Sequence, residues 1–324
     1  MFGYLLKRFL MMAPLMVGIT VITFAVIHLA PGEPIDKMTD MNPKISAQAK
    51  QKMREMYNLD KPLPVQYALW FKRFVQLDFG TSFSPDNRPV LDKIFERMPI
   101  TLFINVVSLV IIFLLAVPLG VLSATRPHTL FDRAATLFVF IGFSTPGFWL
   151  SLLLMILFGV ELGWLPISGI RSIYFEELSP WGKFMDYSRH LVLPILLSSL
   201  TSLTFLSRIT RQNMLEVIRQ DYITTARAKG CAENTVVFHH ALRNALLPIV
   251  TIIGLSVPSL IGGSVIFETV FSIPGMGMLF YESVMSRDYP LVMGILVIGA
   301  GLTLVGNLLA DISYAFADPR IRYE

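Results

Sequence analysis

Few residues in this 324-residue sequence are arranged in a pattern that could do chemistry. His239 and His240 are adjacent, and adjacent side chains of a helix point about 100° apart, so the two imidazoles would not converge on one metal ion. The single cysteine, Cys231, excludes a disulfide framework within the chain and a multi-cysteine metal site. The sequence also contains no HExxH or GxSxG pattern, which argues against an intramembrane hydrolase of the zinc or serine type.

The sequence also lacks a phosphate-binding loop. Its one Gly-Lys pair, Gly182 and Lys183, is followed by Phe184, whereas a P-loop requires Ser or Thr at that position to hold Mg²⁺. We therefore expect this chain to bind no cofactor of its own. The formal charge of +4 gives no reason to expect a nucleic-acid partner.

The composition points instead to a membrane protein. Hydrophobic residues make up 54% of the chain and charged residues 15%, whereas soluble domains contain about 25% charged residues. Several stretches approach the roughly 20 apolar residues that a helix needs to cross a bilayer. These stretches are residues 9–30, 101–123, 134–160, 191–207, 245–270 and 291–312. We predict an all-α integral membrane protein with six transmembrane helices.

Ionisable residues are rare inside these stretches. Only Glu268, Asp311 and His28 occur there, each close to an end. A charge at mid-bilayer costs at least about 2.5 kcal/mol, and a secondary transporter needs ionisable or ion-coordinating groups at that depth. The pattern therefore argues against a secondary transporter.

The basic residues predict the orientation. Segments longer than about 60 residues cross the membrane largely regardless of charge, so the 70-residue segment 31–100 is left out of the comparison. Of the remaining basic residues outside the spans, 12 lie on one side and 4 on the other. The richer side is expected to be cytoplasmic and holds both termini. The chain then divides into the N-terminus and first helix (1–30), an external helical segment (31–100), a five-helix core (101–312) with a cytoplasmic loop (208–244), and a cytoplasmic tail (313–324).

The external segment carries helical patterns of its own. Apolar residues recur at helical spacing over residues 45–56, after Ser46 as a possible cap, and a second helix is expected from Pro64. The apolar face of that second helix, which ends at Gly80, would contain Tyr67, Trp70, Phe71 and Phe74. Such a segment could be a docking surface or simply a cover over the helix bundle.

The cytoplasmic loop contains the string DYITTARAKG, residues 221–230. Asp221 could cap a short helix and Gly230 could end it in a left-handed turn. Arg227 and Lys229 would then lie in the last turn, where the helix dipole favours positive charge. A second helix should run from about Glu233 to Leu242. It would expose Val236, Val237 and Phe238, an apolar patch that marks a partner site unless the loop packs back on its own helix ends.

The run DYITTARAKGCAENTVVFHHALRNALLP, residues 221–248, resembles the EAA loop of ABC importer permeases in its dipeptide and oligopeptide variant. Thr224, Thr225 and Ala226 occupy the Glu-Ala-Ala places, and Gly230 the glycine place. The shared order of further motifs supports this: APGEP (30–34), NLDKPLPVQY (58–67), DFGTSF (78–83), ETVFSIPGMG (268–277), RDYP (287–290) and DPRIR (318–322).

The resemblance implies a permease with the type I ABC importer fold that forms half of a peptide path in the bacterial inner membrane. It also implies a homologous second permease, two ATP-binding subunits that hold ATP and Mg²⁺, and an extracytoplasmic solute-binding protein. The coupling residues implied are Asp221, Tyr222, Thr224, Thr225, Ala226, Arg227, Ala228, Lys229, Gly230, Val236, Val237, Phe238, His240, Leu242 and Arg243.

The fifth apolar stretch contains candidates for the pore or gate. Gly254, Pro258, Gly262 and Gly263 permit either close helix packing or local unwinding. Glu268 could attract a peptide amino terminus, or it could make a salt bridge or hydrogen bond at a helix end. Because nickel-chelate and glutathione permeases belong to the same broader family, those cargoes remain alternatives to peptides.

Overall fold

The computed structural model describes residues 2–29, 32, 34 and 47–317. Apart from one isolated β-bridge between Thr81 and Pro89, the regular structure in this part of the chain is helical. The predicted cap Ser46 and the DPRIR motif lie outside the described residues.

Four helices are long and apolar enough to cross a membrane within the described ranges. They are α1 (Phe2–Leu29), α5 (Val90–Thr125), α8 (Pro180–Ile218) and α15 (Tyr289–Ala317). The predicted fourth stretch, 191–207, is therefore the middle of a 39-residue helix. The sequence underestimated its length because polar residues flank the apolar run at both ends.

The predicted third stretch, 134–160, is bent. It consists of α6 (Leu130–Ser144), α7 (Gly147–Met155) and a π-helical turn (Ile156–Glu161). The two parts meet at 99°, and the pair counts as one further span only if this bent segment crosses the membrane. The bend falls at Thr145, which is extended (φ −89°, ψ 125°) because the residue before a proline, here Pro146, disfavours helical geometry.

The predicted fifth stretch, 245–270, is interrupted. Its parts are α12 (Leu247–Ser256), a 3₁₀ turn (Val257–Leu260) and α13 (Val265–Val270). Gly263 lies in the break with φ +64°, a left-handed conformation that favours glycine. Asn105 of α5 donates to the carbonyl oxygen of Leu260 at 2.7 Å, so it satisfies a backbone group that the unwinding releases.

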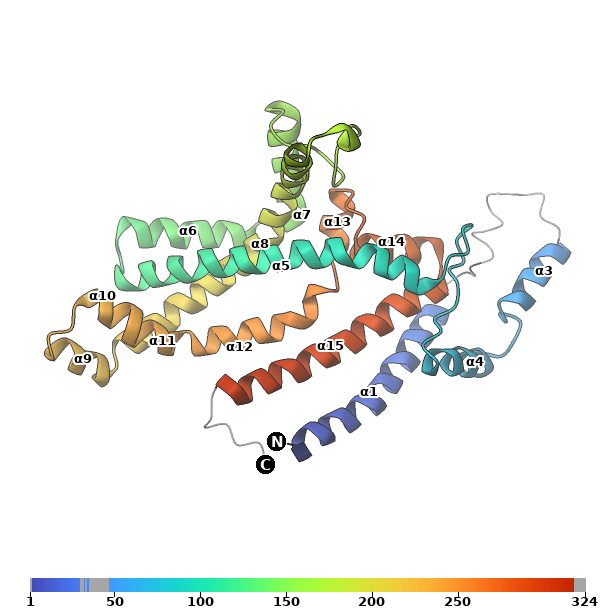
Figure 1. Ribbon diagram of the computed structural model, residues 1–324, viewed down its shortest axis with the longest axis horizontal. Helices are drawn as coiled ribbons and strands as arrows, with labels where there is room; N and C mark the ends of the chain where they lie inside the picture. Colours follow the sequence, from blue (N-terminus) through green and yellow to red (C-terminus); the bar gives the residue numbers. More distant parts are fainter. Residues whose placement is uncertain (1, 30–31, 33, 35–46, 318–324) are drawn as a thin grey trace.

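Helices α5 and α8 form the centre of the fold and pack along most of their length (Figure 1). Gly120 of α5 permits a close approach, since a Cβ atom there would lie 2.7 Å from the carbonyl oxygen of Ser207 and 2.5 Å from the Thr210 side chain. Small residues let transmembrane backbones approach in this way. The pair therefore forms a close-packed centre against which the shorter helices lie.

The two ends of the molecule are built differently (Figure 1). Helices α9 (Asp221–Ala228), α10 (Glu233–Thr235) and α11 (Leu242–Ala245) lie at one end, and α3 (Ala47–Met56) and α4 (Leu63–Val75) at the other. Helix α14 (Met276–Ser286) precedes α15. The first turn of α1 and the last turn of α15 lie toward the α9 side.

A polar network fixes the loop before α5 at the α3–α4 end. Lys93 pairs with Asp86 at 2.8 Å and donates to the Ser82 hydroxyl at 3.0 Å. Ser82 in turn donates to Asp288, which accepts from the Leu291 amide at the start of α15. The Lys93 ammonium lowers the pKa of the Asp86 carboxyl to about 2 by hydrogen bonding to its charged form.

Candidate functional site

Residues 221–245, here called the knob, contain α9, α10, a π-helical turn (Val236–Ala241) and α11. The predicted order of helix, glycine and second helix is confirmed. Gly230 has φ +81° and Arg227 lies in the last turn of α9, as expected, whereas Lys229 is the C-cap residue just after the helix. The start of α9 differs by one residue, because Gln220 is the N-cap and Asp221 begins the helix. Asp221 still places negative charge in the first turn, where the helix dipole favours it.

The interior of the knob is apolar and packs against α5 and α8. Ile223 and Val236 are fully buried in one cluster with Met214 of α8 and Val121 of α5. This overturns part of the predicted exposed patch, because Val236 and Val237 (7% exposed) face inward. Only Phe238 of the three is exposed, at 58%. The loop thus packs back on its helix ends while leaving one aromatic side chain on its surface.

Two polar contacts hold the halves of the knob together. Arg227 of α9 makes a bidentate ion pair with Glu233 of α10, with distances of 2.7 and 3.1 Å. This contact holds the pKa of Glu233 below its ordinary value and raises that of Arg227. Asn244 of α11 donates to the Tyr222 hydroxyl at 2.8 Å. The two contacts bracket the left-handed turn and fix the angle between the helices.

The remaining predicted residues fall into two groups. Ala226, His240 and Leu242 are half-buried, and Ala226 and Leu242 pack against the apolar cluster. The exposed ones are Asp221, Tyr222, Thr224, Thr225, Arg227, Ala228, Lys229, Gly230 and Arg243. The His239 and His240 rings meet edge to face at 83°. No group of three metal-binding side chains occurs among the residues that the structure describes.

Sequence reasoning missed one residue that supports the knob and one ion pair between α6 and α8. Ile223 is the buried anchor of the knob, and its spacing of three from Ala226 on one helix face could have revealed it. The ion pair is a bidentate contact of Arg211 of α8 with the buried Asp132 of α6, at 2.8 and 3.0 Å. That pair is separated by 79 positions, so no local pattern could identify it.

The predicted gate residues lie on both sides of the break in the fifth stretch. Gly254 lies in α12 and Pro258 in the 3₁₀ turn, followed by Gly262 and Gly263. A Cβ atom on Gly263 would lie 2.6 Å from the Gly277 amide nitrogen. This glycine therefore serves close packing.

Glu268 joins three elements in the same region. It is 5% exposed and accepts from the Thr101 hydroxyl of α5 at 2.9 Å and from the Met278 amide of α14 at 3.0 Å. Thr101 accepts from the Met276 amide at 2.8 Å. The carboxylate thus binds the first turn of α14, where helix amides favour negative charge. Of the two predicted roles, the helix-end hydrogen bond is confirmed.

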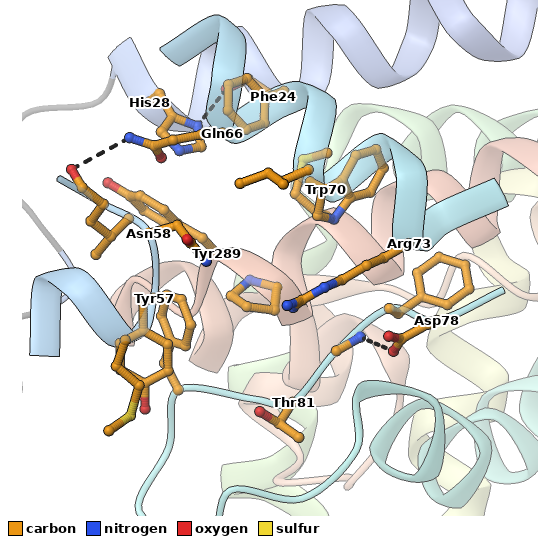
Figure 2. Close-up of a pocket in the computed structure, with 18 residues that line it drawn as sticks. Phe24, His28, Tyr57, Asn58, Gln66, Trp70, Arg73, Asp78, Thr81 and Tyr289 are labelled. Atoms are coloured by element: carbon orange, nitrogen blue, oxygen red, sulfur yellow. Dashed lines mark hydrogen bonds between the residues drawn. The ribbon is translucent and has the colours of Figure 1, made fainter. Parts of the chain in front are cut away.

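The α3–α4 end contains a small pocket of about 140 Å³ (Figure 2). His28 from α1, Trp70 and Arg73 from α4, and Tyr289 from α15 line it. The predicted aromatic face of α4 is confirmed for Tyr67, Trp70 and Phe74, which pack on the core formed with α1 and α15. Phe71 instead contacts the rings of Tyr67 and Phe74 on the same helix. The helix ends at Val75, before the predicted Gly80. Helix α4 is therefore an integral cover of this end.

Comparison with known proteins agrees with this architecture. The family described as binding-protein-dependent transport system inner membrane component matches residues 116–323, and its N-terminal companion family matches residues 1–105. The chain is 46% identical to the oligopeptide transport system permease protein AppB of Bacillus subtilis, over the full length of both chains. It is 35% identical to the dipeptide transport system permease protein DppB of Alkalihalophilus pseudofirmus and 34% identical to that of Escherichia coli, again over full lengths. The chain therefore belongs to the family of inner-membrane components of binding-protein-dependent transport systems.

Proposed function

We propose that this chain is a permease subunit of an ATP-driven importer of di- or oligopeptides. The observation that carries the proposal is the 46% identity to an oligopeptide permease along the whole chain. The chain would form half of the translocation path. Its partners would be a second, homologous permease, two ATP-binding subunits that hold ATP and Mg²⁺, and an extracytoplasmic binding protein.

In the proposed topology the chain crosses the inner membrane six times. The bent α6–α7 segment and the interrupted α12–α13 segment would supply the two crossings beyond the four long helices. Both termini and the knob would be cytoplasmic, and α3 and α4 external. The arrangement in Figure 1 supports this, since the start of α1 and the end of α15 lie toward the knob and α4 lies at the opposite end.

The knob would be the contact with the ATP-binding subunits. Its buried core and its two polar contacts make it a rigid unit on the ends of α5 and α8. A rigid unit can pass a displacement on, whereas a loose loop would absorb it. Phe238, exposed at 58%, is the side chain best suited to insert into a partner, because aromatic anchors dominate many interfaces.

The test is transport by the purified complex. The complete assembly is reconstituted in vesicles, and peptide uptake and ATP hydrolysis are measured together. We expect Phe238→Asp to abolish uptake and to weaken binding of the ATP-binding subunits, because it places a charge in an apolar contact. The matched control is Phe140→Asp on α6, at 67% exposure.

The control should keep the ATP-binding subunits attached, although it can affect insertion into the membrane. If Phe238→Asp retains both normal subunit binding and normal uptake, the knob is not the coupling site. If the unmodified complex imports no peptide, the assigned cargo is wrong.

A further inference from the structure

A second hollow lies in the helical bundle, at the break in the fifth stretch. It has a volume of about 350 Å³ and is bounded by α5, α8, α12 and the 3₁₀ turn. Six of its lining side chains are polar and neutral. They are Asn105, Ser108, Ser198, Ser202, Ser256 and Ser259. Among the described residues that line it, none is charged.

These hydroxyls can still accept or donate hydrogen bonds. Ser256 and Ser259 donate to backbone carbonyls of their own segment, at 2.8 and 2.7 Å. Their hydroxyl oxygens can therefore still accept a hydrogen bond from a molecule in the cavity. Within the described part of the chain, the hydroxyls of Ser198 and Ser202 have no hydrogen-bond partner. The cavity therefore offers both hydrogen-bond acceptors and hydrogen-bond donors.

The cavity opens toward one side of the chain, since Ser202 and Ser259 are exposed and the Phe205 side chain is 53% exposed. Ser202 and Phe205 belong to α8, which is long and apolar enough to cross the bilayer, and Ser259 belongs to the stretch predicted from the sequence to be the fifth span. Polar groups and unwound backbone at that depth are tolerated where they are buried in protein or line water, and not where they face lipid. This opening must therefore be closed by another chain or filled with water.

We propose that this cavity is a section of the translocation path, filled with water and closed on its open side by the second permease. The inference rests on the proposed function and assigns the path to the serine-rich faces of α5, α8 and α12. Neutral hydroxyls would exchange hydrogen bonds with the amide groups that every peptide carries. Because no described lining residue is charged, this section would pass peptides of either charge without holding them, as rapid passage requires.

The assignment differs from the one expected from sequence. Gly263 and Glu268 belong to the close-packed joint with α14, whereas Ser256 and Ser259, only a few positions earlier, line the cavity. The break in the fifth stretch would thus have two sides, one that packs against protein and one that faces the path.

The test is the accessibility of single cysteines in the complete complex. Ser202→Cys and Ser256→Cys are made in a Cys231→Ser background, because Cys231 is the chain's one native cysteine. A membrane-impermeant methanethiosulfonate reagent is added during ATP-driven turnover. The matched control is Leu114→Cys, a residue of α5 that is 63% exposed and outside the cavity.

We expect both serine variants to react at least about tenfold faster than the control, because a thiol reacts as thiolate and ionises poorly in lipid. Added peptide should slow the reaction, and modification should stop uptake. Equal rates for Ser202→Cys and Leu114→Cys would overturn the inference.

The unmodified complex is assayed for uptake first. If it imports no peptide, the proposed function fails, and the labelling rates still decide whether the cavity is a polar path. If it imports peptide and the serine variants do not react faster than the control, only the present inference fails.

A second variant tests the path through its charge. Ser202→Asp should lower uptake of anionic tripeptides relative to cationic ones, because it adds a negative charge to a path that has none among its described lining residues. An unchanged ratio in a complex that still transports would also overturn the inference.

Discussion

Replacing Ile223 with Ala should loosen the knob without unfolding the rest of the chain. The side chain is fully buried in the cluster formed with α5 and α8. The substitution removes three carbon atoms, about 2.4 kcal/mol of transfer free energy at about 0.8 kcal/mol each. The cavity left behind raises the cost to about 3 kcal/mol, within the usual range for such substitutions. Local opening of the knob should become about 10²-fold more frequent.

Amide hydrogen exchange of the whole chain in lipid nanodiscs measures this directly. Exchange should accelerate in α9 to α11 and remain unchanged in the middle of α5. The matched control is Ile22→Ala on α1, the same deletion at a residue that is 65% exposed. If the two variants exchange equally slowly in the knob, Ile223 does not anchor it. Global acceleration in Ile223→Ala would instead show that the knob and the bundle unfold together.

Three further substitutions test other contacts. Gly263→Ala should lower the thermal unfolding midpoint more than Gly230→Ala. Both glycines have positive φ, so alanine would add about 1 kcal/mol of backbone strain at either position, but only at Gly263 would the new Cβ atom lie 2.6 Å from a backbone atom. Equal midpoints for the two variants would contradict this. Glu268→Gln should cost about 1–3 kcal/mol, since its amide turns a donor toward another donor; an unchanged midpoint on denaturant or thermal unfolding would refute the shared hydrogen bonds. Asp86 has a lowered pKa, so the stability it contributes is present above its ordinary value of 3.8 and is lost as pH falls toward 2. Carboxyl NMR should show that value rising in Lys93→Met, and a value that stays near 2 would exclude Lys93 as the cause.

Local patterns in the sequence were enough to predict the short helices. The turn at Gly230, the helix that follows it and the aromatic face of α4 all depend on residues within a few positions of one another. The knob's outer surface was harder, because Val236, Val237 and Phe238 are equally apolar in the sequence. Only the packing against α5 and α8 decides that the first two are buried and the third is exposed.

The interruptions of the apolar stretches also depend on contacts between residues that are distant in the sequence. Pro146 is visible in the sequence, but hydropathy averages over it and predicts an uninterrupted third span. For Gly262 and Gly263 the sequence left close packing and local unwinding both open, and the structure contains the unwound turn. Whether a glycine marks a break or a close contact depends on a neighbour distant in sequence. For Gly263 that neighbour is Gly277, and the freed carbonyl of Leu260 is satisfied by Asn105, 155 positions away.

The length of α8 has a mechanical consequence. At about 1.5 Å per residue, its 39 residues extend for about 58 Å, nearly twice the thickness of the hydrocarbon layer. Its first turn is capped by Ser179, and its last turns carry Met214 under the knob. A helix of this length is long enough to extend beyond both surfaces of the hydrocarbon layer. Pro194 in its interior removes one backbone hydrogen bond, so a displacement of either end would pass through that weakened turn before it reached the other end.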